Sequence, residues 1–466
     1  MVLTLIALLL GALLSRCLYR LYYHPLSKVP GPRLAACTSL WLAYHTYIGD
    51  ECTVVFKLHK KYGPVLRVAP NDVDIASGDA IEPIYLTRGG FPKTPVYSKF
   101  DIEGHTTIFS TLTLPERASR AKAVAPLFST ASIRNSQDTL CGVVDDFVAR
   151  VRRDAGSGQP VNVLQLARAM AIDAVSAYLF QQRYGALDEK ADVMSASPFV
   201  DAYVGVGAFF NFAYGKAGEY LVGLVERLTH GPETESSFTA MDEYTRGLVK
   251  SSVPKSGSYQ SRLLERVSPS QSQIEVKDVC FAGTDSTGMN TATIMWYLAK
   301  NPEIYARLRA SLETTTDTDP LSNPYLRAVI REGLRLSWAN PIRLPRSVPA
   351  SGWTYKGYHF PPGTSVGVAA FQLHQDESVF PDAAEFKPER WLDNPTDEML
   401  NNFFAFGKGA RACIAQNLGQ MEVTLAVLGV ARADLLDGAR VVEDKIEIQE
   451  WFNSRVRGEE ILLRWE

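Results

Sequence analysis

The sequence predicts a mainly α-helical fold with small β-sheets. Apolar residues recur at helical spacing over most of the chain between residues 114 and 336, and again after Cys413. Runs of β-branched and aromatic residues are short and are bounded by proline, glycine and asparagine, which is typical of small sheets. No repeat and no change of composition divides the chain after residue 33, so we expect one large domain over 34–466.

An apolar segment opens the 466-residue chain. Residues 2–14 are apolar except for Thr4, and apolar residues continue past two arginines to Tyr23, about 22 residues in all, which is enough to span a bilayer. In a cleaved signal peptide basic residues precede the apolar run, whereas here they follow it. The sequence therefore predicts a transmembrane anchor over residues 1–23, with the body in the cytosol. A proline-rich hinge is expected over residues 24–33.

The expected strands lie in three parts of the chain. Two β-rich runs at 65–68 and 73–75 flank a Pro-Asn-Asp turn and indicate a hairpin. Prolines, glycines and alternating apolar residues predict irregular strands over 340–365. The tail over 445–464 alternates in the β manner and is expected to close as a hairpin around Asn453 and Gly458.

Helices are expected to supply most of the structure. Residues 251–273, rich in Ser, Gln and Lys, are typical of a linker between two of them. The segment 199–228 is unusually aromatic, which fits either plain core or the wall of a substrate cavity. The expected helices are 117–128, 140–151, 163–180, 199–228, 274–300, 303–312 and 325–336, and one after Cys413.

Composition excludes several classes of function. The net charge is only −3 and no domain-wide basic excess marks a nucleic-acid surface. The six cysteines are scattered, with no CxxC pair and no zinc spacing. We therefore expect reduced thiols, and neither a disulfide framework nor a zinc or iron–sulfur site.

The stretch Phe403–Ala415 is the strongest candidate for chemistry. It joins an aromatic run to Gly407, Gly409 and Arg411, and it ends on Cys413 just before a predicted helix. Free amide groups and the helix dipole favour a thiolate at such a position. The residues alone leave open whether this sulfur is a metal ligand or a nucleophile.

Two helical stretches carry polar groups where a core helix is usually apolar. Residues 281–288 contain two glycines, an acid and several hydroxyls, which fits a kink or a groove that admits a ligand. Glu332 and Arg335 are three residues apart and share one helix face, where they can pair. Neither feature identifies a function alone.

Four motifs follow one another along the chain. Each is short, and their order and spacing carry more information than any single one. They are Ala282-Gly283-x-Asp285-Ser286-Thr287, Glu332-x-x-Arg335, Pro388-x-Arg390 and Phe406-x-x-Gly409-x-Arg411-x-Cys413.

Together these motifs resemble those of the cytochrome P450 superfamily, the haem-thiolate monooxygenases, and most of all its membrane-anchored fungal members. The match runs over nearly the whole chain, with Ala415 where the family's cysteine loop ends in glycine. The resemblance implies the cytochrome P450 fold, with haem b held between a long central helix and the cysteine-loop helix. Cys413 would then be the axial ligand of the iron, and a thiolate there favours O–O cleavage.

The resemblance also assigns roles to other residues. Around the haem, Phe406 would pack at its edge, the loop glycines such as Gly409 would let amides approach the sulfur, and Arg411 and Arg346 would bind propionates. On the oxygen side, Asp285, Ser286 and Thr287 would deliver protons. The family's buried charge network would comprise Glu332, Arg335 and Arg390.

Two positions depart from the family pattern. The family more often has threonine at the position of Ser286, and serine keeps the hydroxyl but loses the methyl group that restricts its rotamer. The family's Trp/His-x-x-x-Arg helix falls at 117–121, where residue 121 is alanine. Arg120 or Lys122 could replace the missing arginine at a propionate, and the sequence leaves this open.

The function implied by the resemblance is oxygen insertion into a lipophilic small molecule. Electrons would come from NADPH through a separate cytochrome P450 reductase, because no Rossmann fingerprint occurs in this chain. An enzyme anchored in the endoplasmic reticulum and acting on a secondary-metabolite intermediate is expected, and Lys408 and Arg411 suggest a reductase docking face. The expected substrate-pocket residues are Phe209, Phe281, Trp338, Ile342 and Phe452.

Two alternatives stay open. One is a haem-thiolate enzyme of the same fold that isomerises, dehydrates or couples its substrate. The other is a membrane-anchored hydrolase with Cys413 as its nucleophile, although no histidine lies near that residue in the sequence. The sequence predicts neither the substrate nor the oligomeric state.

Overall fold

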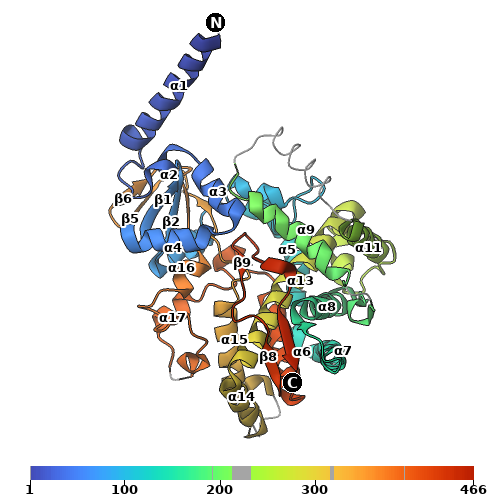
Figure 1. Ribbon diagram of the computed structural model, residues 1–466. Helices are drawn as coiled ribbons and strands as arrows, with labels where there is room; N and C mark the ends of the chain where they lie inside the picture. Colours follow the sequence, from blue (N-terminus) through green and yellow to red (C-terminus); the bar gives the residue numbers. More distant parts are fainter. Residues whose placement is uncertain (1, 191–192, 213–231, 315–319, 393, 466) are drawn as a thin grey trace.

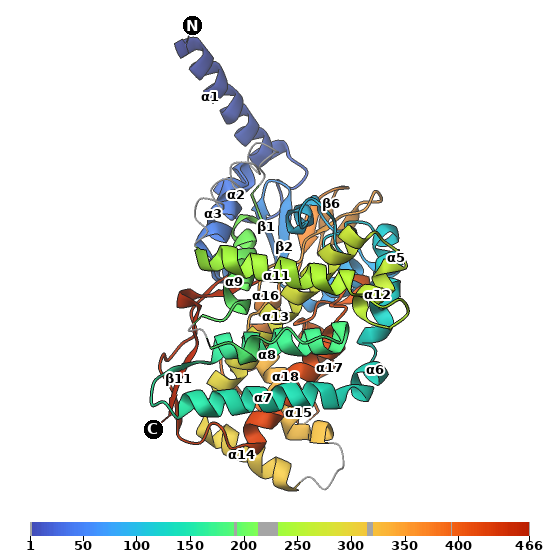
Figure 2. The ribbon, with the colours of Figure 1, turned by 90° about the vertical axis from the view of Figure 1, so that its right-hand side faces the viewer.

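The computed structural model describes residues 2–190, 193–212, 232–314, 320–392 and 394–465 (Figure 1). Helices dominate, and the small sheets lie mainly below the N-terminal helix. Three long helices cross the molecule one beneath another in Figure 2, beside the central helix α13 (Pro269–Lys300): α11 (Pro232–Lys250), α8 (Val163–Val175) and α7 (Gln137–Ala155). The mainly α-helical fold with small sheets is thus confirmed.

The N-terminal helix α1 (Val2–Leu18) projects from the body and continues into a π-helical turn, Tyr19–Tyr23 (Figure 1). Residues Val2–Tyr23 have a mean hydropathy of 2.1 over their most apolar window, and none of it is buried. Length and composition therefore suit a membrane anchor. The segment Val163–Phe180 passes the same test, but it is 89% buried and belongs to the core.

The largest sheet has the strand order β1-β2-β7-β4. β1 (Val65–Ala69) and β2 (Asp72–Ile75) form the expected antiparallel hairpin. β7 (Ser365–Gly367) runs parallel to β2, and β4 (Arg346–Ser347) closes the sheet antiparallel to β7. A separate hairpin joins β5 (Trp353–Tyr355) to β6 (Tyr358–Phe360).

The helical part is built around α13 (Pro269–Lys300), which has 32 residues. It begins at Pro269, five residues before the expected start, because Ser268 caps it through the amide of Gln271. It contacts α8, α15 and α18. The other helices are α2 (Arg33–Cys37), α3 (Leu40–Ile48), α4 (Glu51–Tyr62), α5 (Leu114–Val124), α6 (Thr130–Asn135), α7 (Gln137–Ala155), α8 (Val163–Val175), α9 (Ala196–Val206), α11 (Pro232–Lys250), α12 (Tyr259–Leu264), α14 (Pro302–Thr314), α15 (Pro324–Leu336), α16 (Ala370–His374), α17 (Asp397–Asn402) and α18 (Gln416–Arg432).

Fully buried side chains from several helices form the main core. They include Phe147 of α7, Ile172 of α8, Met295 of α13 and Val427 of α18. α18 begins three residues after Cys413, so its burial against α7, α13 and α15 fixes the position of the cysteine loop.

Three expectations were wrong in part. The expected linker contains the helix α12 and the first residues of α13. Of the helix expected over 199–228, α9 ends at Val206 and a short 3-10 turn follows, while residues 213–231 lie outside the described part.

The third expectation that was wrong in part concerns the C-terminal hairpin. β9 (Ile448–Gln449) and β10 (Arg455–Val456) do pair around Asn453. Beyond Gly458, however, β11 (Leu462–Trp465) pairs with the distant strands β8 (Ala439–Val441) and β3 (Val161–Asn162). Local alternation could not reveal partners so far away in the sequence.

Candidate active site

The cysteine loop is held by its own backbone. The amide of Cys413 donates a hydrogen bond of 2.9 Å to the carbonyl oxygen of Phe406. Gly407 and Gly409 have φ angles of +61° and +80°, which L side chains rarely adopt. A Cβ atom on Gly409 would lie 1.8 Å from the carbonyl oxygen of Tyr85. The loop therefore needs glycine at 409 for close packing as well as for its turn.

The side chain of Cys413 is accessible, although protein atoms surround it. Burial nevertheless raises the pKa of the thiol, against the opposing effect of the Ala415 amide, which hydrogen-bonds to the sulfur. The Ala415 amide favours the thiolate, and desolvation outweighs it here.

One stripe of the central helix is open. Most of α13 between residues 274 and 299 is buried, but Ala282 is exposed and Gly283 and Ser286 are half-buried. These residues lie on adjacent turns of one helix face. A small stripe of this kind leaves room for a ligand against the backbone. A Cβ atom on Gly283 would lie 2.6 Å from a methyl carbon of Val175, so this glycine also allows close helix packing.

The two candidate hydroxyls differ in their surroundings. Ser286 lies on the open stripe and donates to the carbonyl oxygen of Ala282 at 2.8 Å. Thr287 is buried and donates to Glu422 of α18 at 3.1 Å. α13 therefore crosses α18, which begins three residues after Cys413. Sequence reasoning missed Glu422, which is one of several polar residues in the first half of α18.

Asp285 is turned away from the open stripe. It is buried, and Arg168 of α8 donates to its carboxylate at 3.1 Å while Asn453 donates at 3.1 Å. Arg168 also pairs with Asp201 of α9 at 2.9 Å. Burial raises the pKa of Asp285, against the charge of Arg168, which two carboxylates share.

The structure brings Glu332, Arg335 and Arg390 into one buried network. Arg335 makes two hydrogen bonds to Glu332, of 2.9 and 2.8 Å, and Arg390 makes one of 2.9 Å. Trp391 donates to the same carboxylate at 2.9 Å. Burial alone would raise the pKa of Glu332, but the hydrogen bonds and charge of Arg335, with the charge of Arg390, hold it below its ordinary value.

Arg335 also ties this network to the loop before the cysteine. It donates to the carbonyl oxygens of His374 and Ala383 at 2.8 and 2.7 Å. The Nε2 atom of His374 is hydrogen-bonded to the amide of Phe404 at 2.9 Å. Burial, followed by the charge of Arg335, lowers the pKa of His374 to about 3, so its ring is neutral.

Two arginines near the loop have no carboxylate partner among the described residues: Arg346 is buried, and Arg411 is half-buried. Arg346 donates to the hydroxyl of Tyr97 at 3.0 Å, and Arg411 donates to the carbonyls of Thr111 and Leu112 at 2.7 Å each. Among the residues that the structure describes, neither arginine forms an ion pair. Burial and the charges of Arg117 and Arg346 lower the pKa of Arg411 to about 10.

These features fit a haem bound through a thiolate. Cys413 is accessible, α13 carries an open stripe and contacts the helix α18 that follows the cysteine, and Arg346 and Arg411 can bind anions such as propionates. The same features oppose a cysteine hydrolase. In the described part of the chain no histidine is hydrogen-bonded to Cys413, and burial raises the pKa of its thiol.

The expected pocket residues fall into separate places. Ile342 and Phe452 belong to one buried cluster, and Phe281 adjoins it through its contact with Tyr203. Phe209 instead packs on Tyr47 with ring centroids 5.7 Å apart. Trp338 packs on Phe371, at the edge of the cluster. Aromatic residues that sequence reasoning did not single out complete this cluster, together with Phe210 of the expected aromatic stretch: Tyr97, Phe100 and Phe109.

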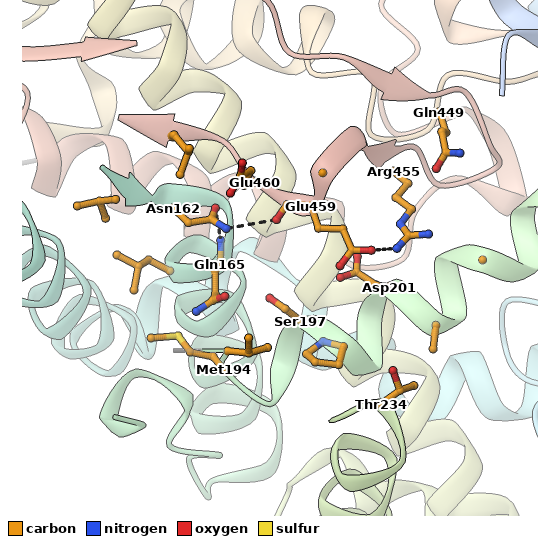
Figure 3. A pocket seen from close by; sticks show the side chains of 18 of the residues that line it. Asn162, Gln165, Met194, Ser197, Asp201, Thr234, Gln449, Arg455, Glu459 and Glu460 are labelled. Atoms are coloured by element: carbon orange, nitrogen blue, oxygen red, sulfur yellow. Dashed lines mark hydrogen bonds and ion pairs between the residues drawn. The ribbon is translucent and has the colours of Figure 1, made fainter. Parts of the chain in front are cut away.

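An open groove of about 1400 Å³ lies between α8, α9 and the C-terminal strands (Figure 3). Polar and apolar side chains line it about equally. Asn162 donates to the backbone of Glu459, and Arg455 pairs with the Glu459 carboxylate. Neither Cys413 nor Ser286 lines it. The groove reaches the central helix through Asp201, which shares Arg168 with Asp285.

Comparison with known proteins agrees with this geometry. The cytochrome P450 family model matches residues 29–219 and 243–430. The cytochrome P450 monooxygenase mfmF of Annulohypoxylon moriforme is 38% identical, with 99% of each chain covered. The pisatin demethylase of Fusarium vanettenii is 26% identical over 89% of this chain and 86% of the relative. The fusicoccadiene C-8 hydroxylase of Alternaria brassicicola is 26% identical over 88% and 84%, respectively.

The family model covers far more than half of the chain, and its matched range contains all four motifs and Cys413. Membership implies a haem cofactor, a redox partner, dioxygen and a lipophilic substrate. The protein is an oxidoreductase of the P450 monooxygenase class, and its chain belongs to the cytochrome P450 family.

Proposed function

We propose that the protein inserts one oxygen atom from O2 into a lipophilic intermediate of fungal secondary metabolism. In the balanced reaction, substrate, O2, NADPH and a proton give hydroxylated product, water and NADP⁺. The observation that carries the proposal is an accessible thiol at Cys413, just before the helix α18 that α13 contacts, together with two arginines, Arg346 and Arg411, that form no ion pair among the described residues. An isomerase would need neither the electrons nor the protons in this equation.

The residues around Cys413 would each hold a different part of the haem. Cys413 would ligate the iron, with the Ala415 amide hydrogen-bonded to its sulfur. Arg346 and Arg411 would bind propionates, and Phe406 would pack at the haem edge. When bound, haem supplies the activation of dioxygen, for which thiolate ligation is suited.

Ser286 is the hydroxyl placed to handle protons at the reacting face. It is half-buried on the open stripe, and its hydrogen bond to the Ala282 carbonyl fixes its rotamer. Thr287 faces away, toward Glu422. Asp285 would act through its links to Arg168 and Asp201, which lead toward the groove shown in Figure 3.

The aromatic cluster around Phe452 and Ile342 supports a lipophilic substrate. Phe452 packs on Phe100 and Phe210 with ring centroids 4.8 and 5.1 Å apart. Such walls bind apolar surface and leave orientation to few polar groups. Two relatives carry names of a demethylase of pisatin and a hydroxylase of fusicoccadiene, which suits a fungal specialised metabolite as the substrate class.

We further propose that the protein is anchored in the endoplasmic reticulum membrane and receives electrons from NADPH–cytochrome P450 reductase. The exposed apolar helix Val2–Tyr23 supports the anchor. For docking, Lys408 is the better candidate of the two basic residues near the loop, although its ammonium group also donates to the Asn401 carbonyl at 2.7 Å. Arg411 points inward to two backbone carbonyls and is not available.

The test combines purified holoenzyme, the fungal reductase, NADPH and ¹⁸O2 with extracts of a strain that lacks this chain. We expect one metabolite to gain a single ¹⁸O atom in an NADPH-dependent manner. A product that forms without NADPH, or that carries no ¹⁸O, would instead identify an isomerase, dehydratase or coupling enzyme.

A further inference from the structure

The departure at Ala121 leaves one propionate contact of the haem without its usual arginine. The structure removes both substitutes that the sequence suggested. Arg120 pairs with Glu275 at 2.7 Å and donates to Thr111, so its charge is already neutralised. Lys122 is exposed on the outer face of α5.

A different cation occupies the interior beside Arg346. Lys93 is only 7% exposed, and its backbone forms an antiparallel bridge with Arg346 of β4. The amide of Ser347 donates to the carbonyl of Pro92 at 2.8 Å, which continues this pairing. Side chains directly opposite each other in such a pair lie on the same face and are close neighbours. Lys93 and Arg346 therefore share one side of the sheet edge.

Like charges opposite each other in a sheet repel, and burial increases the cost. The Lys93 ammonium group lies 4.0 Å from the ring centroids of Tyr97 and Phe109, and it donates to the Phe109 carbonyl. These contacts solvate the ammonium group only in part. Burial, followed by the charges of Arg346, Arg411 and Arg117, lowers the pKa of Lys93 well below its ordinary value.

Four cations thus influence one another, and none of them is paired with a carboxylate within 4 Å in the described ranges. Arg117 lies one turn before Ala121 on α5, and its Nε atom donates to a backbone carbonyl at 3.2 Å. From farther away Asp278 attracts Lys93, and Glu275 attracts Arg117. The four cations are Lys93, Arg117, Arg346 and Arg411.

We propose that Lys93 replaces the arginine missing at position 121, and that with Arg117 it completes a four-cation site for the two carboxylates of the haem. The inference rests on haem binding, which family membership implies, and not on the reaction proposed above. A carboxylate between Lys93 and Arg346 would turn their repulsion into two attractive contacts. Charge-assisted hydrogen bonds of this kind are among the stronger ones in proteins.

The test compares holoenzyme variants by haem retention. Lys93→Met removes the charge but keeps the apolar stem, and Lys122→Met makes the same change on the exposed face of the same region. Haem transfer to excess apomyoglobin is expected to become about 10-fold faster or more for Lys93→Met, from the loss of one charged hydrogen bond. It should stay unchanged for Lys122→Met.

A second measurement separates direct contact from structural support. The propionate bending band in the resonance Raman spectrum is expected to shift in Lys93→Met and to stay in place in Lys122→Met. Faster haem loss with an unshifted band would mean that Lys93 only supports the fold, and it would overturn the proposal. Unchanged haem transfer would overturn it as well.

If Lys93→Met yields no holoprotein, the pair Lys93→Arg and Lys93→Gln decides. We expect Lys93→Arg to retain haem nearly as the parent does and Lys93→Gln to lose it several-fold faster. Equal retention by the two variants would refute the proposal. Since turnover is not measured, failure of the proposed oxygen insertion would leave these outcomes unaffected.

Discussion

Thr287 of α13 and Glu422 of α18 are joined by a hydrogen bond of 3.1 Å across the crossing of the two helices. The second carboxyl oxygen of Glu422 has no partner within the described residues. Burial raises the pKa of this carboxyl to about 8, against the effect of Thr287. Glu422 is therefore neutral at pH 7 and can donate a proton as well as accept one.

This raised pKa predicts a pH dependence of stability. The unfolded chain loses the proton of Glu422 near its ordinary pKa of 4.5, whereas the folded protein holds it up to about pH 8. The stabilisation is full below about pH 4.5 and declines up to about pH 8, by roughly 1.4 kcal/mol per pH unit for one proton. Glu422→Gln lacks this decline. Melting temperatures of both holoenzymes from pH 5 to 8 check it, and parallel curves would contradict it.

The buried network predicts a large loss on removal of its acid. Glu332→Gln leaves Arg335 buried without its counter-charge, which should cost about 3–5 kcal/mol and most of the bound haem. The control is Glu389→Gln, since Glu389 is half-buried and pairs with Arg307 at the surface, and glutamine can still accept the hydrogen bond of the Tyr325 hydroxyl. That change should cost about 1 kcal/mol or less. Urea unfolding and haem content measure both variants, and equal losses would speak against the network's special role.

Replacing each of the two loop glycines by alanine should affect haem incorporation to a different extent. A Cβ atom at Gly409 would collide with the Tyr85 carbonyl, so Gly409→Ala should displace the loop and abolish haem incorporation. At Gly407 the nearest atom is a methyl carbon of Leu344 at 3.5 Å, which is ordinary contact. Gly407→Ala should then cost only the backbone strain, about 1–2 kcal/mol. The haem content of the two purified proteins decides, and a loop tolerant of both changes would disprove the close packing.

Removal of the two hydroxyls of α13 should change the amount of product formed per NADPH consumed to different extents. Ser286→Ala removes the hydroxyl on the open stripe, so product per NADPH should fall about 10-fold or more while peroxide rises. Thr287→Val removes only the bond to Glu422 and should keep most of the coupling. Product and peroxide are measured per NADPH consumed. A larger effect at Thr287 would reverse the assignment.

The parts of the site that could be predicted from sequence are those encoded locally. The cysteine loop, the glycine-containing stretch of α13 and the Glu332/Arg335 pair each lie within a few residues, and local spacing predicts them. Asp285 binds Arg168, 117 residues away, and no local pattern announces that partner. Lys93 likewise stands alone in a loop, and only the strand pairing with Arg346 gives it a role.

The aromatic cluster around Phe452 is a second feature that local sequence patterns do not predict. Aromatic residues such as Phe209 and Phe210 are neighbours in the sequence, yet Phe210 joins the cluster around Phe452 while Phe209 packs on Tyr47. Which of the two joins the cluster depends on how α9 ends, and a short turn after Val206 decides it. Helical periodicity alone does not predict that turn.

The central claim is that Cys413 binds haem iron as a thiolate. The most direct measurement is the absorption spectrum of the reduced, carbon-monoxide-bound protein, recorded for the natural chain and for Cys413→His. We expect the strongly red-shifted Soret band of thiolate ligation in the natural chain and its loss in Cys413→His. A natural chain that binds haem without the red-shifted band would show that Cys413 is not a thiolate ligand of the iron.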